Sequence, residues 1–217
     1  MKSELVIRKT LDGSPTLYLP ELGEHYHSVN GAVQESRHVY IEAAFNQCLK
    51  KEIHVLEMGF GTGLNAFLTI LEARKRNISL FYTALEKYPL SFEVVNALNY
   101  SEEEKELFER IHLAPWNTPV SVEFCCTINK INIDFLSYDY PGRYDVVYYD
   151  AFAPDKQANV WDQSLFNHLY LSMNTGGILS TYCAKGEIRR RMKNAGFTVN
   201  RLSGPPGKRE MLQAVKP

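Results

Sequence analysis

The 217-residue sequence predicts an α/β protein built on a doubly wound, mostly parallel sheet. Three observations lead to this prediction. From residue 52 onward, short apolar stretches alternate with helical patterns, a glycine-rich turn joins the first stretch to a helix, and the chain closes on two strand-like segments around GPPGKRE. Alternating strands and helices favour a parallel sheet with helices on both faces. The closing pair predicts that the last strand runs antiparallel.

The first 50 residues predict a small N-terminal extension, and residues 51–217 predict the main Rossmann-like domain. Residues 4–9 and 16–19 are strand-like around the turn Asp12-Gly13-Ser14-Pro15, which is a hairpin signal. Residues 32–49 place apolar side chains on one helical face. The extension is therefore expected to be a β-hairpin followed by a helix.

The main domain divides into strands and helices by the same criteria. The helix over 101–111 is expected to begin at Ser101, because Ser101-Glu102-Glu103-Glu104 forms a capping box with acidic residues at the positive end of the helix dipole. Strands are expected at 53–58, 80–85, 120–126, 128–135, 145–149 and 178–182, helices at 64–76, 89–98, 101–111, 164–173 and 187–194, and a closing β-pair at 197–202 and 211–215.

The composition excludes disordered, fibrous and disulfide-scaffold proteins. Apolar residues make up 45% and charged residues 23% of the chain, as in globular proteins. The cysteines lack C-x-x-C spacing and a histidine placed as a zinc ligand, so we predict reduced thiols and no metal. The N-terminus has no signal-peptide pattern, and no apolar stretch approaches the roughly 20 residues of a membrane span. We expect a cytoplasmic protein without a membrane partner.

The glycine-rich turn follows the first buried strand of the main domain and opens a helix. Its glycines match neither G-x-G-x-x-G nor a phosphate loop ending in GK[ST]. The acid-x-G-x-G-x-G spacing instead matches motif I of class I methyltransferases, in which the acid neutralises or orients the methionine ammonium of S-adenosylmethionine. A bare strand-to-helix connection is the alternative. We predict that the cofactor S-adenosylmethionine is bound here by Glu57, Gly59, Phe60, Gly61, Gly63 and Asn65.

Further acids stand at the ends of the next two strands. Glu86 ends the second strand, where a carboxylate accepts two hydrogen bonds from a ribose diol, and Lys87 follows it in the predicted cofactor site. The alternative for Glu86 is a solvated loop carboxylate. Asp134 and Asp139 follow the third strand, where an acid accepts a hydrogen bond from the adenine amino group. Asp134 is favoured over Asp139.

Asp150 ends the fourth strand, in the segment YYDAFAP. A carboxylate at that strand end faces the methyl group of the cofactor, where it accepts hydrogen bonds from an amine and aligns the lone pair. Methyl transfer is an in-line displacement, so positioning and desolvation of the nucleophile supply most of the rate. A helix cap or a turn is the alternative role. We predict Asp150 as the catalytic residue.

Five segments carry a resemblance to a known family: VLEMGFGTGLN, LEKYPL, YYDAFAPDKQANVWDQSLFNHL, LSTYCAKGEIRRRMKNAGFTV and GPPGKREML. From the YHS segment near Tyr26 to Met211, the chain resembles the methyltransferase domain of the MnmC family of bifunctional tRNA-modification proteins. The resemblance implies methylation of the aminomethyl group on the wobble (2-thio)uridine of certain tRNAs. It places the family's catalytic aspartate on Asp150 and nominates residues 26–35 for the substrate site.

The family's bifunctional members continue into an FAD-dependent oxidoreductase domain, and the sequence shows no dinucleotide fingerprint for one. We therefore expect the stand-alone methyltransferase form. Its aminomethyl substrate is then expected to come from a separately encoded enzyme.

The segment from Lys185 to Glu210 is strongly basic. It holds eight basic and two acidic residues, a net +6, so the remainder of a chain with formal charge -1 carries -7. Such a face is expected to contact phosphates of a tRNA anticodon stem-loop, although consecutive arginines are as often only solvated charge. An aromatic side chain near the pocket is expected to stack on a flipped-out base, with a core position as the alternative for Trp161. The substrate and RNA candidates are Tyr26, Ser28, Phe152, Pro154, Trp161, Arg189, Arg190, Lys208 and Arg209.

Three other functions compete with this interpretation. A small-molecule N- or O-methyltransferase uses the same fold. An aminopropyltransferase uses a related cofactor with an aspartate at a similar strand end. A silent RNA-binding module is the non-enzymatic alternative, which the presence of Glu57, Glu86 and Asp150 together disfavours.

Overall fold

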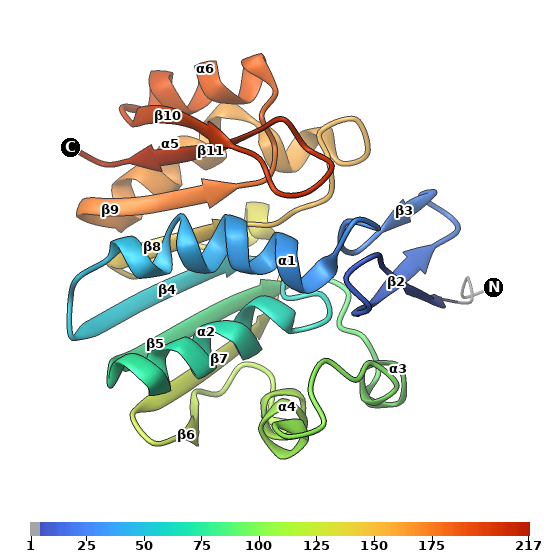
Figure 1. Ribbon diagram of the computed structural model, residues 1–217. Helices are drawn as coiled ribbons and strands as arrows, with labels where there is room; N and C mark the ends of the chain where they lie inside the picture. The colour runs from blue at the N-terminus through green and yellow to red at the C-terminus, as the bar shows by residue number, and fades with distance from the viewer. Residues whose placement is uncertain (1–4) are drawn as a thin grey trace.

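The computed structural model describes residues 5–217, which form an eight-stranded and a three-stranded sheet (Figure 1). The strand order of the larger sheet is β10-β11-β9-β8-β4-β5-β7-β6. Its order reverses between β4 and β8, which pair in parallel, and this confirms the doubly wound prediction. The parallel strands are β4 (Glu52–Met58), β5 (Ser79–Glu86), β7 (Cys126–Asn132), β8 (Tyr144–Tyr149) and β9 (Met173–Thr181).

Antiparallel strands close both ends of this sheet. β6 (Val120–Glu123) pairs with β7, and β11 (Glu210–Val215) lies between β9 and β10 (Thr198–Ser203) and runs antiparallel to both. The predicted closing pair is thereby confirmed. Because β4, β5 and β8 run in the same direction, their carboxyl ends meet at one edge of the sheet, and the residues that follow them are brought together there.

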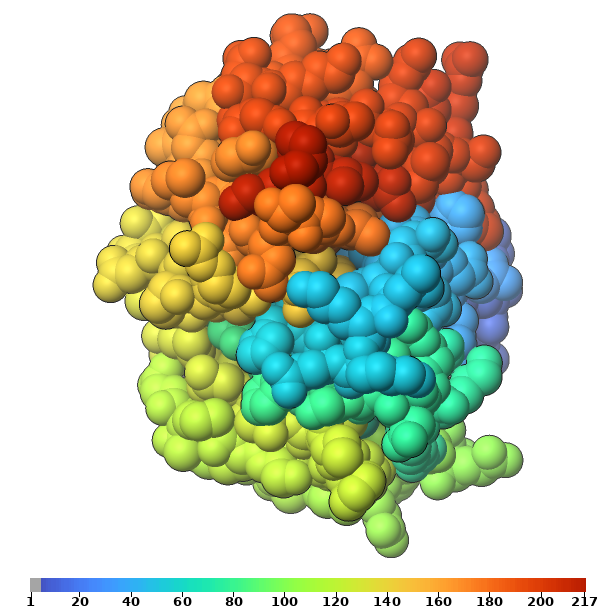
Figure 2. Space-filling model, turned by 90° about the vertical axis from the view of Figure 1, so that its left-hand side faces the viewer, coloured from blue at the N-terminus to red at the C-terminus, as the bar shows by residue number. Residues whose placement is uncertain are grey.

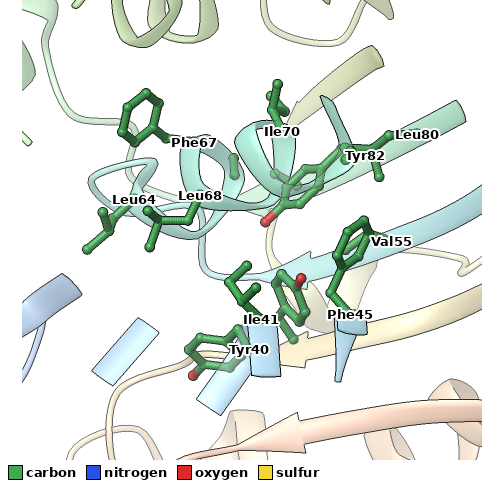
Figure 3. Packing of buried hydrophobic residues seen from close by; sticks show 14 of the residues in the cluster. Tyr40, Ile41, Phe45, Val55, Leu64, Phe67, Leu68, Ile70, Leu80 and Tyr82 are labelled. Atoms are coloured by element: carbon green, nitrogen blue, oxygen red, sulfur yellow. The ribbon is translucent and has the colours of Figure 1, made fainter. Parts of the chain in front are cut away.

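Helices cover both faces of the larger sheet and enclose two hydrophobic cores. Along β4 the side chains alternate, so that Val55 packs into one core and Leu56 into the other. The first core includes residues of α1 (Ala32–Ser36), the π-helical segment η1 (Arg37–Glu42), α2 (Leu64–Arg76) and α4 (Lys105–Leu113). Figure 3 shows Tyr40 and Ile41 of η1 below α2 and in front of the strands of the sheet. The second core includes residues of α5 (Gln163–Ser172), α6 (Gly186–Ala195) and the short helices η3 (Phe135–Ser137) and η4 (Ala158–Trp161).

The three-stranded sheet stands beyond the carboxyl ends of the parallel strands (Figure 1). It consists of β1 (Val6–Lys9), β2 (Pro15–Leu19) and β3 (Glu24–His25), in that order. The hairpin of β1 and β2 was predicted from the sequence, but β3 was not. Residue 4, which was expected to begin the first strand, lies outside the described residues. Since the helix after this sheet shares the first core with α2, the division of the chain at residue 50 stays a prediction.

Three predicted helices differ from the structure. The helix expected over 32–49 is divided into α1, η1 and the 3₁₀ turn η2 (Phe45–Gln47), and the wide turn of η1 buries Val39, Tyr40 and Ile41 together. The helix expected over 89–98 is only α3 (Phe92–Asn96). The start at Ser101 is wrong: α4 begins at Lys105, because Glu102 accepts a hydrogen bond from Asn99 and Glu104 pairs with Arg74.

Figure 2 shows the face of the molecule that lies opposite the three-stranded sheet and carries the amino ends of the parallel strands. On it the C-terminal segments lie at one end and residues from about 100 to 140 at the other, as the strand order requires. Within residues 5–217, no helix combines the length and the apolar composition needed to cross a bilayer. The same residues contain no group of three or more His, Cys, Asp or Glu side chains arranged to hold a metal ion.

Candidate active site

A cavity of about 1510 Å³ lies at the carboxyl ends of β4, β5 and β8. Its wall is formed by the glycine-rich turn, the loops after β5 and β8, the three-stranded sheet and the β10–β11 loop. Ligands of doubly wound sheets bind in this crevice, where the strand order reverses. The cavity exceeds the roughly 300–1,000 Å³ of most small-molecule pockets, so it has room for two ligands side by side.

The glycine-rich turn brings bare backbone to this cavity. Gly59, Gly61 and Gly63 have φ angles of 99°, 50° and 73°, which favour glycine. A Cβ at Gly59 would lie 2.7 Å from the carbonyl oxygen of Asp150, so the turn and the loop after β8 touch through main chain alone. Phe60 lines the cavity but is largely buried, with its ring centroid 5.8 Å from that of Trp116. The turn fits a ligand that lies against main-chain amides.

Glu86 lies half-buried in the cavity wall, as predicted for a ribose ligand. Its Oε2 accepts a hydrogen bond from the Gly61 amide at 3.0 Å, and its Oε1 accepts one from the Tyr88 amide at 2.8 Å. Burial raises the pKa of this carboxyl group. A carboxylate has about four acceptor sites, so two remain for hydroxyl donors. Glu86 thus meets the chemical requirement for holding a diol.

Lys87 and Asp134 form an ion pair at the cavity wall. The Lys87 Nζ lies 2.8 Å from Asp134 Oδ2, and the other oxygen of Asp134 accepts the Leu136 amide at 3.0 Å to cap η3. Both pair members line the cavity, whereas Asp139 is exposed and is not among the lining residues. The choice of Asp134 over Asp139 agrees with this placement, although a contact with adenine stays a prediction.

Glu57 lies behind the glycine-rich turn rather than in the cavity wall. Its side chain is fully buried, and neither carboxylate oxygen has a hydrogen-bond partner among residues 5–217. Burial raises the pKa of the group well above its usual range. Side chains two apart on a strand share a face, so Glu57 points with Val55 toward the α2 side of β4. The predicted contact with the methionine ammonium is therefore not seen in this arrangement.

Asp150 follows β8 directly and lines the cavity. Its amide donates to the Met58 carbonyl at 3.0 Å, and its Oδ2 accepts a hydrogen bond from Asn65 Nδ2 at 2.8 Å. Burial raises the pKa of Asp150 to about 6, while the hydrogen bond from Asn65 favours the charged form. Asp150 is thus a half-buried acid at the cavity wall. Asn65 was predicted as a cofactor ligand, and the structure shows it bound to Asp150.

Lys208 also reaches the cavity, from the β10–β11 loop. Its Nζ lies 2.6 Å from Oε1 of Glu35 and 3.9 Å from the centroid of the Tyr182 ring. Glu35 accepts the Ser28 amide through its other oxygen at 2.8 Å. Lys208 is therefore already paired with Glu35, and its contact with an RNA phosphate stays a prediction. Tyr182 was missed because a tyrosine just past an apolar strand carries no sequence signal of a site.

Of the predicted aromatic residues, Tyr26 and Phe152 line the cavity with ring centroids 5.4 Å apart. Burial and the charge of Glu86 raise the pKa of Tyr26 to about 12. Trp161 is 0% exposed and donates its Nε1–H to the Phe152 carbonyl at 2.8 Å, so the core alternative holds and base stacking by Trp161 is wrong. Pro154 is likewise buried and is not among the lining residues.

The remaining basic candidates lie outside the cavity wall. Arg190 and Arg209 are exposed and Arg189 is half-buried on α6. The neighbouring Arg191 instead donates to the Trp161 carbonyl at 2.6 Å, which fixes α6 to η4. The basic segment is thus divided between structural cations and cations open to a partner.

Comparisons with known proteins identify the family of the chain. A family model described as S-adenosyl-L-methionine-dependent methyltransferase matches residues 88–217. The bifunctional tRNA 5-methylaminomethyl-2-thiouridine biosynthesis protein MnmC of Leptospira borgpetersenii serovar Hardjo-bovis (strain JB197) is 30% identical over 86% of this chain and 31% of its own length. The MnmC protein of Marinomonas sp. (strain MWYL1) is 27% identical over 92% of the chain and 32% of its own length. The chain thus spans about a third of these curated relatives.

Two solved structures share the fold. MNMC2 from Aquifex aeolicus superposes with a TM-score of 0.83 at 22% identity, over 98% of this chain and 70% of that one. A spermidine synthase from Thermotoga maritima gives a TM-score of 0.59 at 12% identity, over 97% of this chain and 72% of that one. Together with the glycine-rich turn and the strand-end acids, the family match leads to one conclusion: the chain belongs to the S-adenosyl-L-methionine-dependent methyltransferases, is homologous to the methyltransferase domain of MnmC, and uses S-adenosyl-L-methionine as its methyl donor.

Proposed function

We propose that this methyltransferase acts on tRNA and methylates the 5-aminomethyl group of the wobble (2-thio)uridine. The observation that carries the proposal is the half-buried Asp150, held by Asn65 at the wall of a cavity large enough for both cofactor and base. The names of the MnmC relatives, which refer to tRNA 5-methylaminomethyl-2-thiouridine biosynthesis, support the choice of nucleoside.

Several residues of the cavity would hold S-adenosylmethionine. Glu86 would accept hydrogen bonds from the ribose hydroxyls, and the main chain from Gly59 to Gly63 would face the methionine part. Asp134, beside Lys87, would accept from the adenine amino group. When bound, the cofactor supplies an electrophilic methyl group on a positively charged sulfur.

Asp150 orients the acceptor amine and does not serve as a strong base. A primary amine has a solution pKa near that of lysine, about 10, so it arrives mostly as an ammonium ion. A carboxylate alone would favour that ion, but desolvation in the cavity disfavours the charged form of the amine. The amine proton is therefore lost to solvent, and Asp150 accepts an N–H hydrogen bond from the neutral amine. This bond turns the lone pair toward the methyl carbon.

The contact with RNA would extend from this cavity over the basic C-terminal segment. Arg190 and Arg209 are exposed cations, and Arg189 is half-exposed, so they are available for phosphates of an anticodon stem-loop. Tyr26 and Phe152 form an aromatic corner on which a flipped-out base would stack. We further propose that the protein acts in the cytoplasm.

Nucleoside mass spectrometry of tRNA from a gene-deletion strain tests the proposal. Deletion is expected to remove the methylaminomethyl nucleoside and to accumulate the aminomethyl one. Wild-type protein and Asp139→Asn should restore methylation, whereas Asp150→Asn should not. An unchanged nucleoside profile would overturn the tRNA substrate and leave a small-molecule methyltransferase.

A further inference from the structure

Asn65 links the proposed catalytic carboxylate to the N-terminal extension. It stands in the first turn of α2, is 3% exposed, and donates from Nδ2 to Asp150 Oδ2 at 2.8 Å. Its Oδ1 accepts a hydrogen bond from the hydroxyl of Ser36, the last residue of α1. Both polar ends of one amide side chain are therefore bonded, one to each of two segments far apart in sequence.

The carboxylate of Asp150 decides which way this amide faces, because an ionised carboxylate only accepts hydrogen bonds. In a state turned by 180°, Asn65 would present an oxygen to that carboxylate, which repels it. The hydroxyl of Ser36 can donate or accept, and here it donates to Oδ1 and anchors the other end of the amide. Since Ser36 is also buried, water cannot readily take its place.

We propose that Ser36 and Asn65 are positioning residues for methyl transfer: Ser36 fixes the amide of Asn65, and Asn65 holds the Asp150 carboxylate in line with the amine. The inference rests on the proposed role of Asp150. It replaces the expected contact of Asn65 with the cofactor by a contact with the catalytic group. It also makes the N-terminal extension part of the catalytic machinery, because Ser36 belongs to α1.

The electrostatic surroundings of Asp150 give this arrangement a measurable pH signature. Glu35 of α1, Tyr40 of η1, Glu57 of β4, Tyr182 after β9 and Lys208 of the β10–β11 loop all act on Asp150 electrostatically or by hydrogen bonding. Asn65 donates to the charged form and so lowers the pKa of Asp150 against the effect of burial. Loss of this donor is expected to raise that pKa. The acid limb of the pH–rate profile should then move to higher pH, because activity requires the carboxylate.

Three variants test the proposal on the purified protein with aminomethyluridine tRNA. Asn65→Asp keeps the side-chain volume but replaces the donor by a second carboxyl group, and it should lower kcat by about 10- to 100-fold with the acid limb shifted upward. Ser36→Ala should lower kcat by about 3- to 30-fold. Ser172→Ala is the matched control, since it removes another buried hydroxyl, which donates to the Leu169 carbonyl at 3.0 Å on the opposite face of the sheet. It should leave kcat unchanged.

Calorimetric binding of S-adenosylmethionine separates positioning from a cofactor contact. Asn65→Asp and Ser36→Ala should bind the cofactor as the wild type does. Weakened binding with an unchanged kcat would overturn the inference and return Asn65 to the cofactor site. Thermal unfolding shows whether each variant is folded, and if Ser36→Ala is not, the isosteric Asn65→Asp variant and its pH profile decide alone.

A double-mutant cycle shows whether Ser36 acts through Asp150. If it does, Ser36→Ala should slow the wild type but not the residual activity of Asp150→Asn. Equal effects in both backgrounds would overturn the inference and leave the role of Asp150 intact. An Asp150→Asn variant with nearly full activity would instead overturn the proposed function itself, so the two failures are distinguishable.

Discussion

The ammonium group of Lys208 lies 2.6 Å from the carboxylate of Glu35, which joins the β10–β11 loop near the end of the chain to α1 near its beginning. The Glu35 side chain is only 10% exposed and that of Lys208 is 33% exposed. The pair therefore joins two parts of the cavity wall that come from opposite ends of the sequence. Asp150 lies next to this wall and is influenced electrostatically by both residues.

Breaking this pair should destabilise the protein. Lys208→Met leaves the Glu35 carboxylate buried without its cation, and we expect the free energy of unfolding to fall by about 1–2 kcal/mol, less than for a fully buried pair because Lys208 is partly exposed. Urea unfolding measures the change. Lys185→Met is the control, because its ion pair with Asp155 is exposed on both sides and should contribute little to stability. Equal losses in both variants would contradict a special role for the Lys208 pair.

Gly59→Ala should abolish catalysis. The substitution strains a φ angle of 99° and also places a methyl group 2.7 Å from the Asp150 carbonyl, so it displaces the catalytic loop. Gly176→Ala is a matched control, since its φ is 78° but no atom lies within 4 Å of the added Cβ. Initial rates and unfolding midpoints should show a similar cost of backbone strain in both variants and a loss of kcat only in Gly59→Ala. Full activity of Gly59→Ala would refute the close approach.

Glu86→Ala should weaken binding of S-adenosylmethionine by about 1–3 kcal/mol, through lost hydrogen bonds to the ribose. Isothermal titration calorimetry on protein freed of co-purified ligand gives the affinity. Asp139→Ala, which removes an exposed acid outside the cavity, should bind the cofactor normally. The assignment of Glu86 to the ribose fails if both variants bind alike.

Asp150→Asn keeps the side-chain shape but removes the charge, so turnover should fall by roughly 10²–10⁴-fold. Cofactor binding should persist, because the proposed cofactor ligands lie elsewhere. In the wild type, activity should fall as the pH drops through about 6, the raised pKa of Asp150. A rate within a few-fold of the wild type in steady-state assays would remove Asp150 from the mechanism.

The same variant should be more stable than the wild type at neutral pH. The folded-state pKa of Asp150 is raised from 3.8 to about 6, so the unfolded chain ionises first and stability is lost as the pH rises between these values. Asp150→Asn removes this loss, and we expect a gain of about 1–2 kcal/mol in urea unfolding at pH 7 and little difference near pH 4. A gain of the same size at both pH values would mean that ionisation is not its cause.

Substituting Arg189 and Arg190 together by alanine should lower tRNA affinity and reduce the slope of log affinity against log salt by about 1–2 units. Cofactor affinity should not change. Lys51 and Arg143 are exposed at the opposite edge of the sheet, and their double alanine variant should leave the slope unaltered. Filter binding across a salt series compares the two. An unaltered slope for the arginine pair would show that these side chains are only solvated.

The sheet and the strand-end acids could be predicted because their signals are local. A strand that runs into glycines fixes where the turn lies, and parallel strands bring Glu86 and Asp150 to one edge whatever the rest of the chain does. The contacts of Asn65 and Lys208 could not be predicted in this way. They depend on how α1 packs against α2 and the β10–β11 loop, which no spacing in the sequence reports.

Two other differences between the expected and the observed placement of side chains have a similar origin. Glu57 matches the acid of the methyltransferase motif by spacing, but its orientation depends on which face of β4 is buried beneath α2. Trp161 is placed in the core by a hydrogen bond to a loop carbonyl and by packing against Tyr149, 4.6 Å away between ring centroids. Both residues are close in sequence to residues that line the cavity, but tertiary packing buries their side chains away from it.

The π-helical segment η1 makes the N-terminal part of the site sensitive to length rather than to composition. Residues Arg37–Glu42 contain a wide turn between α1, which carries Glu35 and Ser36, and the chain that leads into β4. The segment already holds about one residue more than an ordinary α-helix needs for the same rotation, so deleting one residue would leave the facing of Ser36 nearly unchanged. A further residue inserted at α-helical spacing would rotate α1 by about 100° about its axis. Ser36 would then face away from Asn65, and Glu35 away from Lys208. Natural variation in this segment should therefore consist of replacements or single deletions and not of insertions.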